Sequence, residues 1–294
     1  MKKTIIAAAV AAAVAAPAAF ADVKISGQIN AEIFDNDGAN GYQMDENSDV
    51  KISGSEDLGN GMKAFFTINT SPDATGADFG EDDRYVGLSG DFGTVTLGRF
   101  ENLLTSKIST FVDNDAADSL TVEVLGVGTS RAQEGVRYQA PSMNGFTIAA
   151  EAYLDGQGTQ TTTTANADTV NVMVSYSNAG LTVSAGQSSQ EDASEDVTVI
   201  GAKYAMGDLA ATVVMTDSDV AATGESTVAG ISYKMGANQI VINHVFEDDA
   251  TTSTDGDTLV TLKHSLSKAT NVYVGFKSDD DGEDTTLIGM KHSF

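Results

Sequence analysis

The densest group of potential metal ligands in the sequence is the acidic run at 279–284, in which five carboxylates surround Gly282. Carboxylates at such density can bind Ca²⁺, but an EF-hand loop places its ligands at fixed positions, ends in a glutamate at the twelfth, and lies between two helices. The run has neither this spacing nor the flanking pattern. We therefore interpret it as a solvated loop and predict no resident metal ion.

Residues that could support acid–base or covalent catalysis are sparse. The chain has no cysteine and only three histidines, His244, His264 and His292. A hydrolase would need one of them to activate a serine, and the spacing of the three matches neither a catalytic triad nor a zinc motif. The sequence favours a protein that is not an enzyme and has no cofactor. A lipase that uses His244 or His264 is the catalytic alternative.

The N-terminal residues predict export before they predict a fold. Two lysines precede an apolar stretch at 5–16, and Ala19 and Ala21 are small residues at the positions that a signal peptidase requires. The stretch is shorter than the roughly 20 residues that a transmembrane helix needs. We expect cleavage after Ala21, so that 1–21 is a signal peptide and 22–294 is the mature domain.

Composition and charge limit the remaining classes. The formal net charge is −26, which argues against a nucleic-acid partner because phosphate backbones repel an acidic protein. Glycine is abundant (29) and proline rare (3), and no second apolar run in the sequence has the length of a membrane-spanning helix. Since only helices and closed barrels satisfy every backbone amide in lipid, a membrane protein with this sequence must be a β-barrel.

Alternation with period two runs through most of the mature chain and predicts strands with one apolar and one polar face. Along 23–33 the apolar side chains share one parity and the polar ones the other. The faces of Gln239–Glu247 cannot be assigned in this way. The clearest apolar rows are Val23, Ile25, Ile29 and Ile33; Met62, Ala64, Phe66 and Ile68; Phe146, Ile148, Ala150 and Leu154; and Val272, Val274 and Phe276.

Short and long polar connectors alternate between these strands. Clusters of turn-forming residues mark seven tight turns and eight longer loops, which separate sixteen strands. An even strand number with this alternation is typical of bacterial outer-membrane barrels, whose turns are periplasmic and whose loops face outward. The fold class expected is all-β, a 16-stranded antiparallel transmembrane β-barrel. A secreted β-sandwich is the alternative, although it would not require so regular an alternation.

Five ordered motifs resemble those of the Gram-negative trimeric porins. The last six residues, 289–294, are similar to the C-terminal signature of that family, and Phe294 would help close the last strand on the first. The resemblance covers the whole mature chain in order. The other motifs are Gly54–Gly61, Tyr85–Arg99, Val136–Pro141 followed by Asn144–Phe146, and Leu266–Thr270, where the family usually has Leu-Ser-Lys-Arg-Thr.

The resemblance implies a homotrimer of 16-stranded barrels, each with a pore narrowed by an inward-folded constriction loop. The longest connector, about 101–129, takes the position of that loop, although the usual Pro-Glu-Phe-Gly-Gly core is missing. Asp113, Asp115 and Asp118 fall where the family places its acidic constriction residues; an ordinary exposed loop is the alternative. The connector also has apolar side chains that a solvated loop would not need, which predicts that it folds onto a wall: Leu103, Leu104, Ile108, Phe111 and Val112.

The basic wall that faces this loop in the family is depleted here. Gln28, Asp49 and Asp82 stand where the family has basic residues, and only Arg131 is at an expected place. Carboxylates that line a pore without an opposing basic ladder concentrate cations, so we expect a preference for cations that is stronger at low salt. If Asp49 and Asp82 lie at the mouth, the selectivity would be slight. Arg84 lies two residues after Asp82, and Arg137 lies six residues after Arg131, so even spacing predicts that each arginine faces the same way as its partner. The predicted pore wall is Gln28, Asp49, Asp82, Arg84, Arg131 and Arg137.

The function expected is passive diffusion of small hydrophilic solutes and ions through a water-filled channel in the outer membrane of a Gram-negative bacterium. The surroundings would be lipid and lipopolysaccharide, to which the run at 279–284 could bridge through divalent ions. The alternative is a non-conducting structural or adhesive barrel that acts through its acidic surface loops. Aromatic residues near strand ends are expected in the interfacial girdle: Tyr138, Tyr204, Tyr233, Tyr273 and Phe294.

Overall fold

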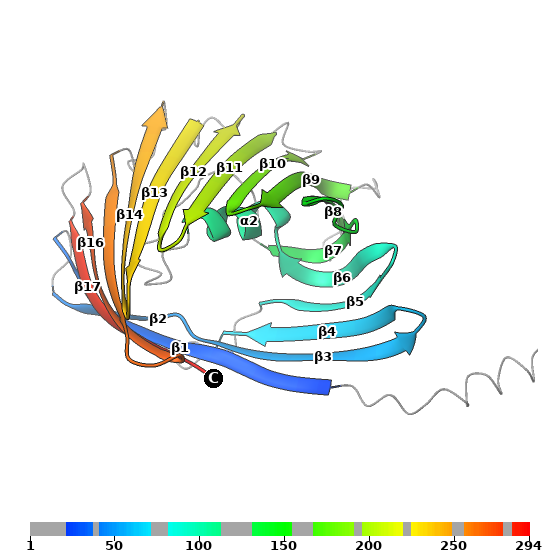
Figure 1. The fold of residues 1–294 in the computed structure, drawn as a ribbon, viewed down its shortest axis with the longest axis horizontal. Helices are drawn as coiled ribbons and strands as arrows, with labels where there is room; N and C mark the ends of the chain where they lie inside the picture. Colours follow the sequence, from blue (N-terminus) through cyan, green and yellow to red (C-terminus); the bar gives the residue numbers. More distant parts are fainter. Residues whose placement is uncertain are drawn as a thin grey trace, which may run out of the picture.

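The protein is a single closed β-sheet whose ends meet. In the computed structural model, the first strand β1 (Asp22–Asn36) pairs antiparallel with the last strand β17 (Thr285–Ser293), and every strand between them pairs with its neighbours (Figure 1). Closure leaves no sheet edge with unpaired amides, as lipid requires. The structure describes residues 22–37, 41–71, 82–112, 131–154, 167–190, 196–219, 225–248, 256–278 and 284–294.

Seventeen strand segments in the described ranges build sixteen barrel positions. On one side of β1, Asp22–Gln28 pairs with β3 and Ala31–Phe34 pairs with β2, so β2 and β3 together act as one interrupted strand. The predicted strand number of sixteen is confirmed. The segments between β1 and β17 are β2 (Gln43–Glu46), β3 (Asp49–Gly59), β4 (Met62–Thr70), β5 (Arg84–Gly90), β6 (Gly93–Glu101), β7 (Arg131–Gln139), β8 (Phe146–Leu154), β9 (Ala167–Asn178), β10 (Leu181–Gln190), β11 (Val197–Met206), β12 (Leu209–Ser218), β13 (Glu225–Met235), β14 (Asn238–Asp248), β15 (Thr258–Ser265) and β16 (Thr270–Ser278).

The seven tight turns all lie at one end of the barrel, which we call the turn end; the opposite end is the loop end. At the first turn, Asn60 has a φ of 52° between two glycines that also have positive φ. Asparagine and glycine are the residues that accept this left-handed backbone, so the local sequence selects a tight hairpin. All eight longer connectors start and finish at the loop end.

The two faces of the sheet differ in the way that the alternation predicts. On β1, Ile25 is 64% exposed and faces outward, whereas Asn30 and Glu32 are buried inside at 6% and 3%. On β14, where no face could be assigned from sequence, Phe246 faces outward and Val245 faces inward. Apolar side chains therefore predominate on the outer face of the described strands, and the inner face is mixed.

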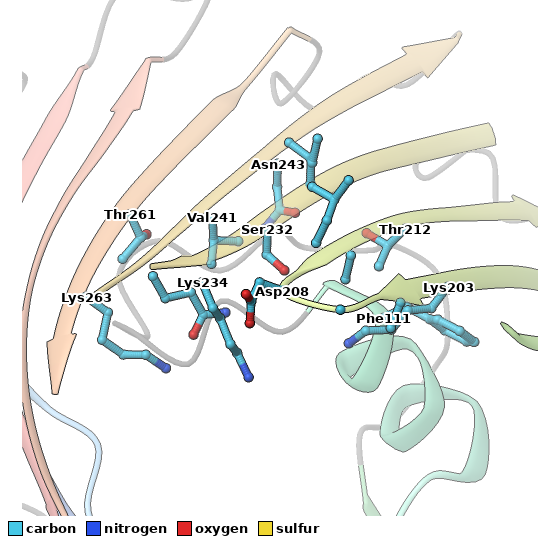
Figure 2. A pocket seen from close by; sticks show the side chains of 16 residues that line it. Phe111, Lys203, Asp208, Thr212, Ser232, Lys234, Val241, Asn243, Thr261 and Lys263 are labelled. Carbon is cyan, nitrogen blue, oxygen red and sulfur yellow. The ribbon is translucent and has the colours of Figure 1, made fainter. Parts of the chain in front are cut away.

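A hollow remains inside this sheet. A cavity of about 330 Å³ lies against the inner face of β11–β15 toward the turn end, next to the end of the helix α2 (Leu103–Val112) (Figure 2). Its lining is polar over most of the strand positions and includes the lysines Lys203, Lys234 and Lys263. The interior thus keeps space next to charged side chains instead of closing over an apolar core.

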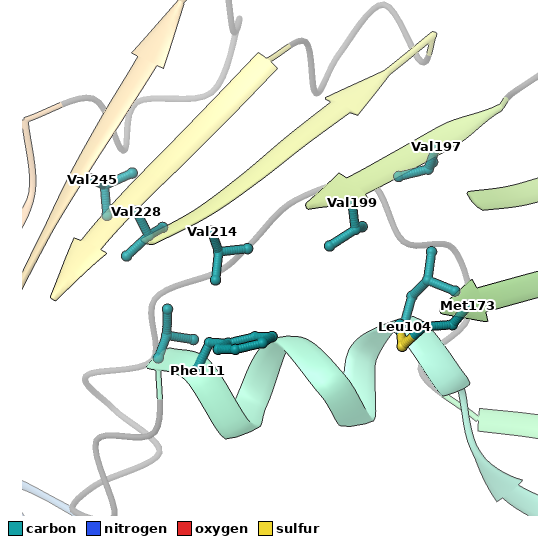
Figure 3. Close-up of a cluster of buried hydrophobic side chains, with 9 residues drawn as sticks. Leu104, Phe111, Met173, Val197, Val199, Val214, Val228 and Val245 are labelled. Atoms are coloured by element: carbon teal, nitrogen blue, oxygen red, sulfur yellow. The ribbon is translucent and has the colours of Figure 1, made fainter. Parts of the chain in front are cut away.

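The helix α2 lies inside the barrel and packs on the inner face of β8–β13 (Figures 1 and 3). Its Leu104, Phe111 and Val112 are buried in the largest apolar cluster of the described residues. Phe111 lies directly on the backbone of Gly201, where an added Cβ would come within 2.6 Å of its ring. We call the strand side of this cluster the covered wall; it comprises Met173, Val197, Val199, Val214, Val228 and Val245.

The apolar content of the long connector is explained by this packing. Burial of one large apolar side chain contributes about 1.5–3 kcal/mol, so three of them hold a ten-residue helix that would be marginal alone in water. The prediction that this part of the connector folds onto a wall is confirmed for 103–112. The remainder of the predicted loop, 113–129, lies outside the described residues.

Candidate functional site

The first turn of α2 begins at a buried asparagine. The Oδ1 atom of Asn102 accepts a hydrogen bond from the backbone N–H of Leu104 at 2.8 Å, and Asn102 is only 1% exposed. Asparagine is among the residues preferred at this capping position because its side chain satisfies an N–H group that has no partner within the helix. The start of the helix is thereby fixed where β6 ends.

Glu151 on β8 fixes the same end of the helix to the barrel wall. Its Oε1 accepts hydrogen bonds at 2.7 Å from the backbone N–H of Leu103, from the hydroxyl of Tyr153 and from the amide of Asn171. Its Oε2 lies 2.6 Å from the guanidinium of Arg137. The side chain of Glu151 is fully buried, so this carboxylate has exchanged its water for four protein donors and joins α2 to three strands.

Arg137 lies between this carboxylate and an aromatic group. Its guanidinium is 4.3 Å above the centroid of the Phe100 ring, a cation–π contact. Phe100 in turn contacts Tyr85 edge to face, with ring centroids 6.4 Å apart. The guanidinium also donates to the backbone carbonyl of Glu101. Arg137 is thus a structural link between the inner wall and the base of α2.

The other end of α2 is held by two polar contacts. The Lys203 ammonium donates to the carbonyl of Thr110 at 3.2 Å, and the Asn243 amide to the carbonyl of Val112 at 3.5 Å. Both carbonyls belong to the last turn, where the helix dipole favours a positive charge. Lys203 and Asn243 also line the cavity at the turn end, so the helix end and the cavity share a boundary.

Two of the predicted wall residues lie side by side on the inner face. Gln28 and Asp49 are direct partners across β1 and β3, on the parity of the buried Asn30. Neither is fully buried. They are placed on the far side of the lumen from α2, near the loop end of β3.

The structure brings Asp82 and Arg131 together at the loop end. The Arg131 guanidinium lies 3.4 Å from Asp82 and 3.3 Å from Asp83, and Asp82 also accepts a hydrogen bond from the Ser71 hydroxyl. Two carboxylates therefore face one guanidinium here. Asp83 was not among the residues predicted.

Arg84 is placed on the other face of the sheet. It pairs directly with Ile68 across β4 and shares the parity of Val86 and Leu88, all three of which are exposed on the outer surface. The expectation that Arg84 shares the facing of Asp82 is wrong, because β5 begins only at Arg84 and the alternation does not extend back to Asp82.

The last residue completes the seam of the barrel. Phe294 and Gly27 exchange two backbone hydrogen bonds of 3.0 and 2.9 Å. Its ring is 53% exposed, as expected for a residue of the outer girdle.

One aromatic residue assigned to the girdle lies inside instead. Tyr273 is 2% exposed, and its hydroxyl donates to Asn30 at 2.6 Å. Its neighbours Val272 and Val274 take the outward parity, so the alternation itself predicts this placement, and the girdle assignment was wrong. Tyr138, Tyr204 and Tyr233 are exposed.

The predicted constriction aspartates Asp113, Asp115 and Asp118 lie outside the described residues. The signal peptide, 1–21, and most of the acidic run at 279–284 do so as well. Their assignments stay predictions.

The histidines serve as cross-strand hydrogen-bond partners. His244 bonds Thr258, His264 bonds Asn238 and His292 bonds Thr270, at 2.8–2.9 Å. Among the described residues no cluster of three potential metal ligands occurs. Nor does any helix in that part of the chain have the length and apolarity to cross a membrane.

Sequence reasoning did not single out Glu151 or the three cavity lysines. Alternation places each of them on the inner parity of its strand but does not give its contacts, and on β11 that parity is mixed because Lys203 shares it with Val197 and Val199. The lysines carry one further signal, since each lies within four residues of a tight turn. This spacing places them at one end of the lumen.

The architecture indicates the class of protein. A closed barrel with a mostly apolar outer surface, polar side chains around an inner cavity and a helix on its inner wall is typical of a membrane-spanning channel protein.

Comparison with known proteins identifies the family. A sequence profile of Gram-negative porins matches residues 7–284, and the chain belongs to this family. It is accordingly a multi-pass protein of the outer membrane and not an enzyme.

Relatives and solved structures agree with this assignment. The major outer membrane proteins P.IB of Neisseria meningitidis serogroup B and Neisseria lactamica are 26% and 27% identical, with full coverage of both chains in each case. The anion-selective porin from Comamonas acidovorans has a TM-score of 0.73 at 22% identity and covers 94% of this chain and 100% of its own. A variant of the Rh. blastica porin has a TM-score of 0.76 at 13% identity, with 92% and 100% coverage.

Proposed function

We propose that the barrel lets small hydrophilic solutes and ions diffuse passively through its lumen, that the connector at about 101–129 narrows it, and that three copies assemble in the membrane. The observation that carries the proposal is the position of α2. Within the described part of the connector, α2 packs on the apolar inner face of β8–β13 and leaves partly exposed polar side chains on the inner face of β1–β4 uncovered. Water and solutes would pass between the two.

The uncovered inner face suits hydrated solutes. It presents hydroxyl, amide and charged side chains that are neither buried nor packed against α2; we call it the far wall. A polar lining of this kind allows small solutes to exchange contacts with water and side chains at little cost. The far wall comprises Ser26, Gln28, Asp49, Lys51 and Asn69.

We further propose a modest preference for cations. At the loop end, the two carboxylates of Asp82 and Asp83 share the one guanidinium of Arg131. The chain as a whole carries 42 acidic and 16 basic residues. Three lysines at the turn end act against this preference, and the structurally similar porin from Comamonas acidovorans is anion-selective.

Planar-bilayer recording tests conduction and selectivity separately. We expect conductance steps in groups of three. In a tenfold KCl gradient at low salt, the reversal potential should have the sign of a cation-selective channel. A reversal potential of the opposite sign would overturn the cation preference and leave the pore intact. A purified, folded barrel that never conducts would overturn the pore and favour a structural or adhesive role.

The constriction role of the aspartates is tested in the same recording. Replacement by asparagine of Asp113, Asp115 and Asp118 together should reduce the cation preference, because three charges leave the narrowest part of the lumen. An unchanged reversal potential would place these residues outside the constriction.

The mature N-terminus has its own test. We propose that cleavage after Ala21 releases a chain that starts at Asp22, the first residue of β1. Mass spectrometry of the protein purified from outer membranes should give the mass of 22–294, and detection of the full-length mass would contradict this.

A further inference from the structure

We propose that Lys203, Lys234 and Lys263 form a binding site for small polyanions, carboxylates or phosphates, in the turn-end half of the lumen. The proposal rests on the proposed conduction, since its test is a block of the channel current. Conduction and block fail in different ways, so the two proposals can be told apart.

The three lysines surround one cavity. They come from β11, β13 and β15, and their side chains extend along the same pocket (Figure 2). Lys234 and Lys263 both pair directly with Gln239 on β14, so two strand spacings separate their backbones. Two spacings amount to roughly 10 Å, a span that two flexible lysine side chains can bridge to hold an anion between them.

The charge balance of the cavity is opposite to that of the protein. Among the residues that the structure describes, its ionisable lining consists of the three lysines and one carboxylate, Asp208, in a chain where acidic residues outnumber basic ones by 42 to 16. Three ammonium groups around one volume attract an anion that carries several negative charges.

The remaining lining supplies directional contacts. Side-chain hydroxyls and amides can donate to oxyanions around the lysines, and Phe111 closes the side toward α2. Lysine acts as a point charge and does not distinguish the planar carboxylate from the tetrahedral phosphate. We therefore infer a site for the shared chemistry, a compact ion with several oxyanion groups. The neutral polar residues involved are Thr212, Ser232, Gln239, Asn243 and Thr261.

The site lies on the opposite side of α2 from the acidic loop end. Lys203 holds the last turn of α2 through Thr110, and Lys234 and Lys263 lie nearer the turns that follow their strands. An anion that enters from the turn end reaches the lysines without passing Asp82 and Asp83. Block should therefore depend on the side of addition.

The experiment is block of single-channel KCl current by citrate and, separately, by inorganic pyrophosphate, each added to one compartment at a time. Citrate reports on carboxylates and pyrophosphate on phosphates. We expect both anions to reduce the current of the native channel at low salt, where screening is weak. The half-blocking concentration should be at least about fivefold lower for addition at the turn end than at the loop end, because the acidic loop end repels anions that enter there.

Two matched variants locate the effect. Lys234→Gln should raise the half-blocking concentration roughly tenfold for either anion, since one of three nearby charges is lost. Lys63→Gln removes the same charge from an inward position at the turn end of β4, away from the cavity. This control variant should change the half-blocking concentration less than about twofold. The double variant Lys234→Gln with Lys263→Gln should abolish the difference between the two compartments.

Each outcome decides the proposal. A conducting channel that neither anion blocks, or equal loss of block in Lys234→Gln and Lys63→Gln, overturns the site. Block by pyrophosphate but not by citrate overturns the inferred breadth of the site and restricts it to phosphates. Loss of all current in the native protein overturns the proposed function instead.

Discussion

The covered wall and the far wall are parts of one sheet with opposite inner surfaces. The covered wall presents valines to the lumen, where α2 packs on them, whereas the far wall presents serine, glutamine, asparagine and charged groups, which suit contact with water. Both walls turn apolar side chains to the lipid. Inner residues of a barrel therefore report what lies against them, and an apolar inner row indicates a packed element.

Glu151 joins the first turn of α2 to β7, β8 and β9, and the loss of its carboxylate should have the largest effect. Glu151→Ala leaves Arg137, Tyr153, Asn171 and the first helical N–H without their shared acceptor. Breaking a buried charged group of this kind costs about 3–5 kcal/mol. We expect a lower denaturant midpoint in detergent and a noisy, larger conductance as α2 detaches.

The Glu151→Gln variant serves as the control for Glu151→Ala. It keeps one oxygen acceptor and the side-chain volume, so it should retain part of the stability. If both variants conduct like the native channel, Glu151 does not position α2.

The apolar contact of α2 with the covered wall should have the second largest effect. Phe111→Ala removes the ring that lies on Gly201 and should lower stability by about 3 kcal/mol. Single-channel conductance should rise because the helix end is no longer held inward.

Phe65→Ala is the matched aromatic change on another part of the inner surface. Phe65 contacts Tyr85 edge to face at 6.4 Å and is not part of the cluster around α2. It should lower stability without raising conductance. An equal conductance change in both variants would mean that the covered wall has no special role.

The charge pairs at the loop end should give the smallest change in stability and a change in selectivity. Arg131→Gln frees Asp82 and Asp83 from a partly exposed guanidinium, at a cost of about 1 kcal/mol or less. Its reversal potential should shift further toward cations.

Arg84→Gln removes the same charge from the outer face of the sheet. The reversal potential of this variant should stay near that of the native channel. A larger shift for Arg84→Gln than for Arg131→Gln would contradict the facings assigned to the two arginines.

Local alternation and turn residues were sufficient to predict the barrel. Strand positions, tight turns and the number sixteen follow from period-two patterns that each strand carries independently. The pattern fails where a side chain of the same type is needed on both faces. On β14, Val241 and Val245 face inward, and Ile240 and Phe246 face outward. Because apolar residues occupy both faces of this strand, its sequence does not alternate between apolar and polar residues.

The site was harder to predict because its contacts join distant segments. Glu151 meets Leu103 across 48 positions in the sequence, and Lys203 meets Thr110 across 93. Spacing within a strand gives the facing of such residues but not their partners. Even the face on which a side chain lies can be mispredicted, as for Arg84. Alternation holds only inside a regular strand, and Asp82 lies before the start of β5.

The short length of α2 has a consequence for the order of assembly. Ten residues gain too few internal hydrogen bonds to repay the ordering of a helix in water, and the valines that compensate come from strands more than sixty positions later in the chain. The segment 103–112 should therefore become helical only after those strands have paired. The wall that stabilises the helix would then form before the helix does.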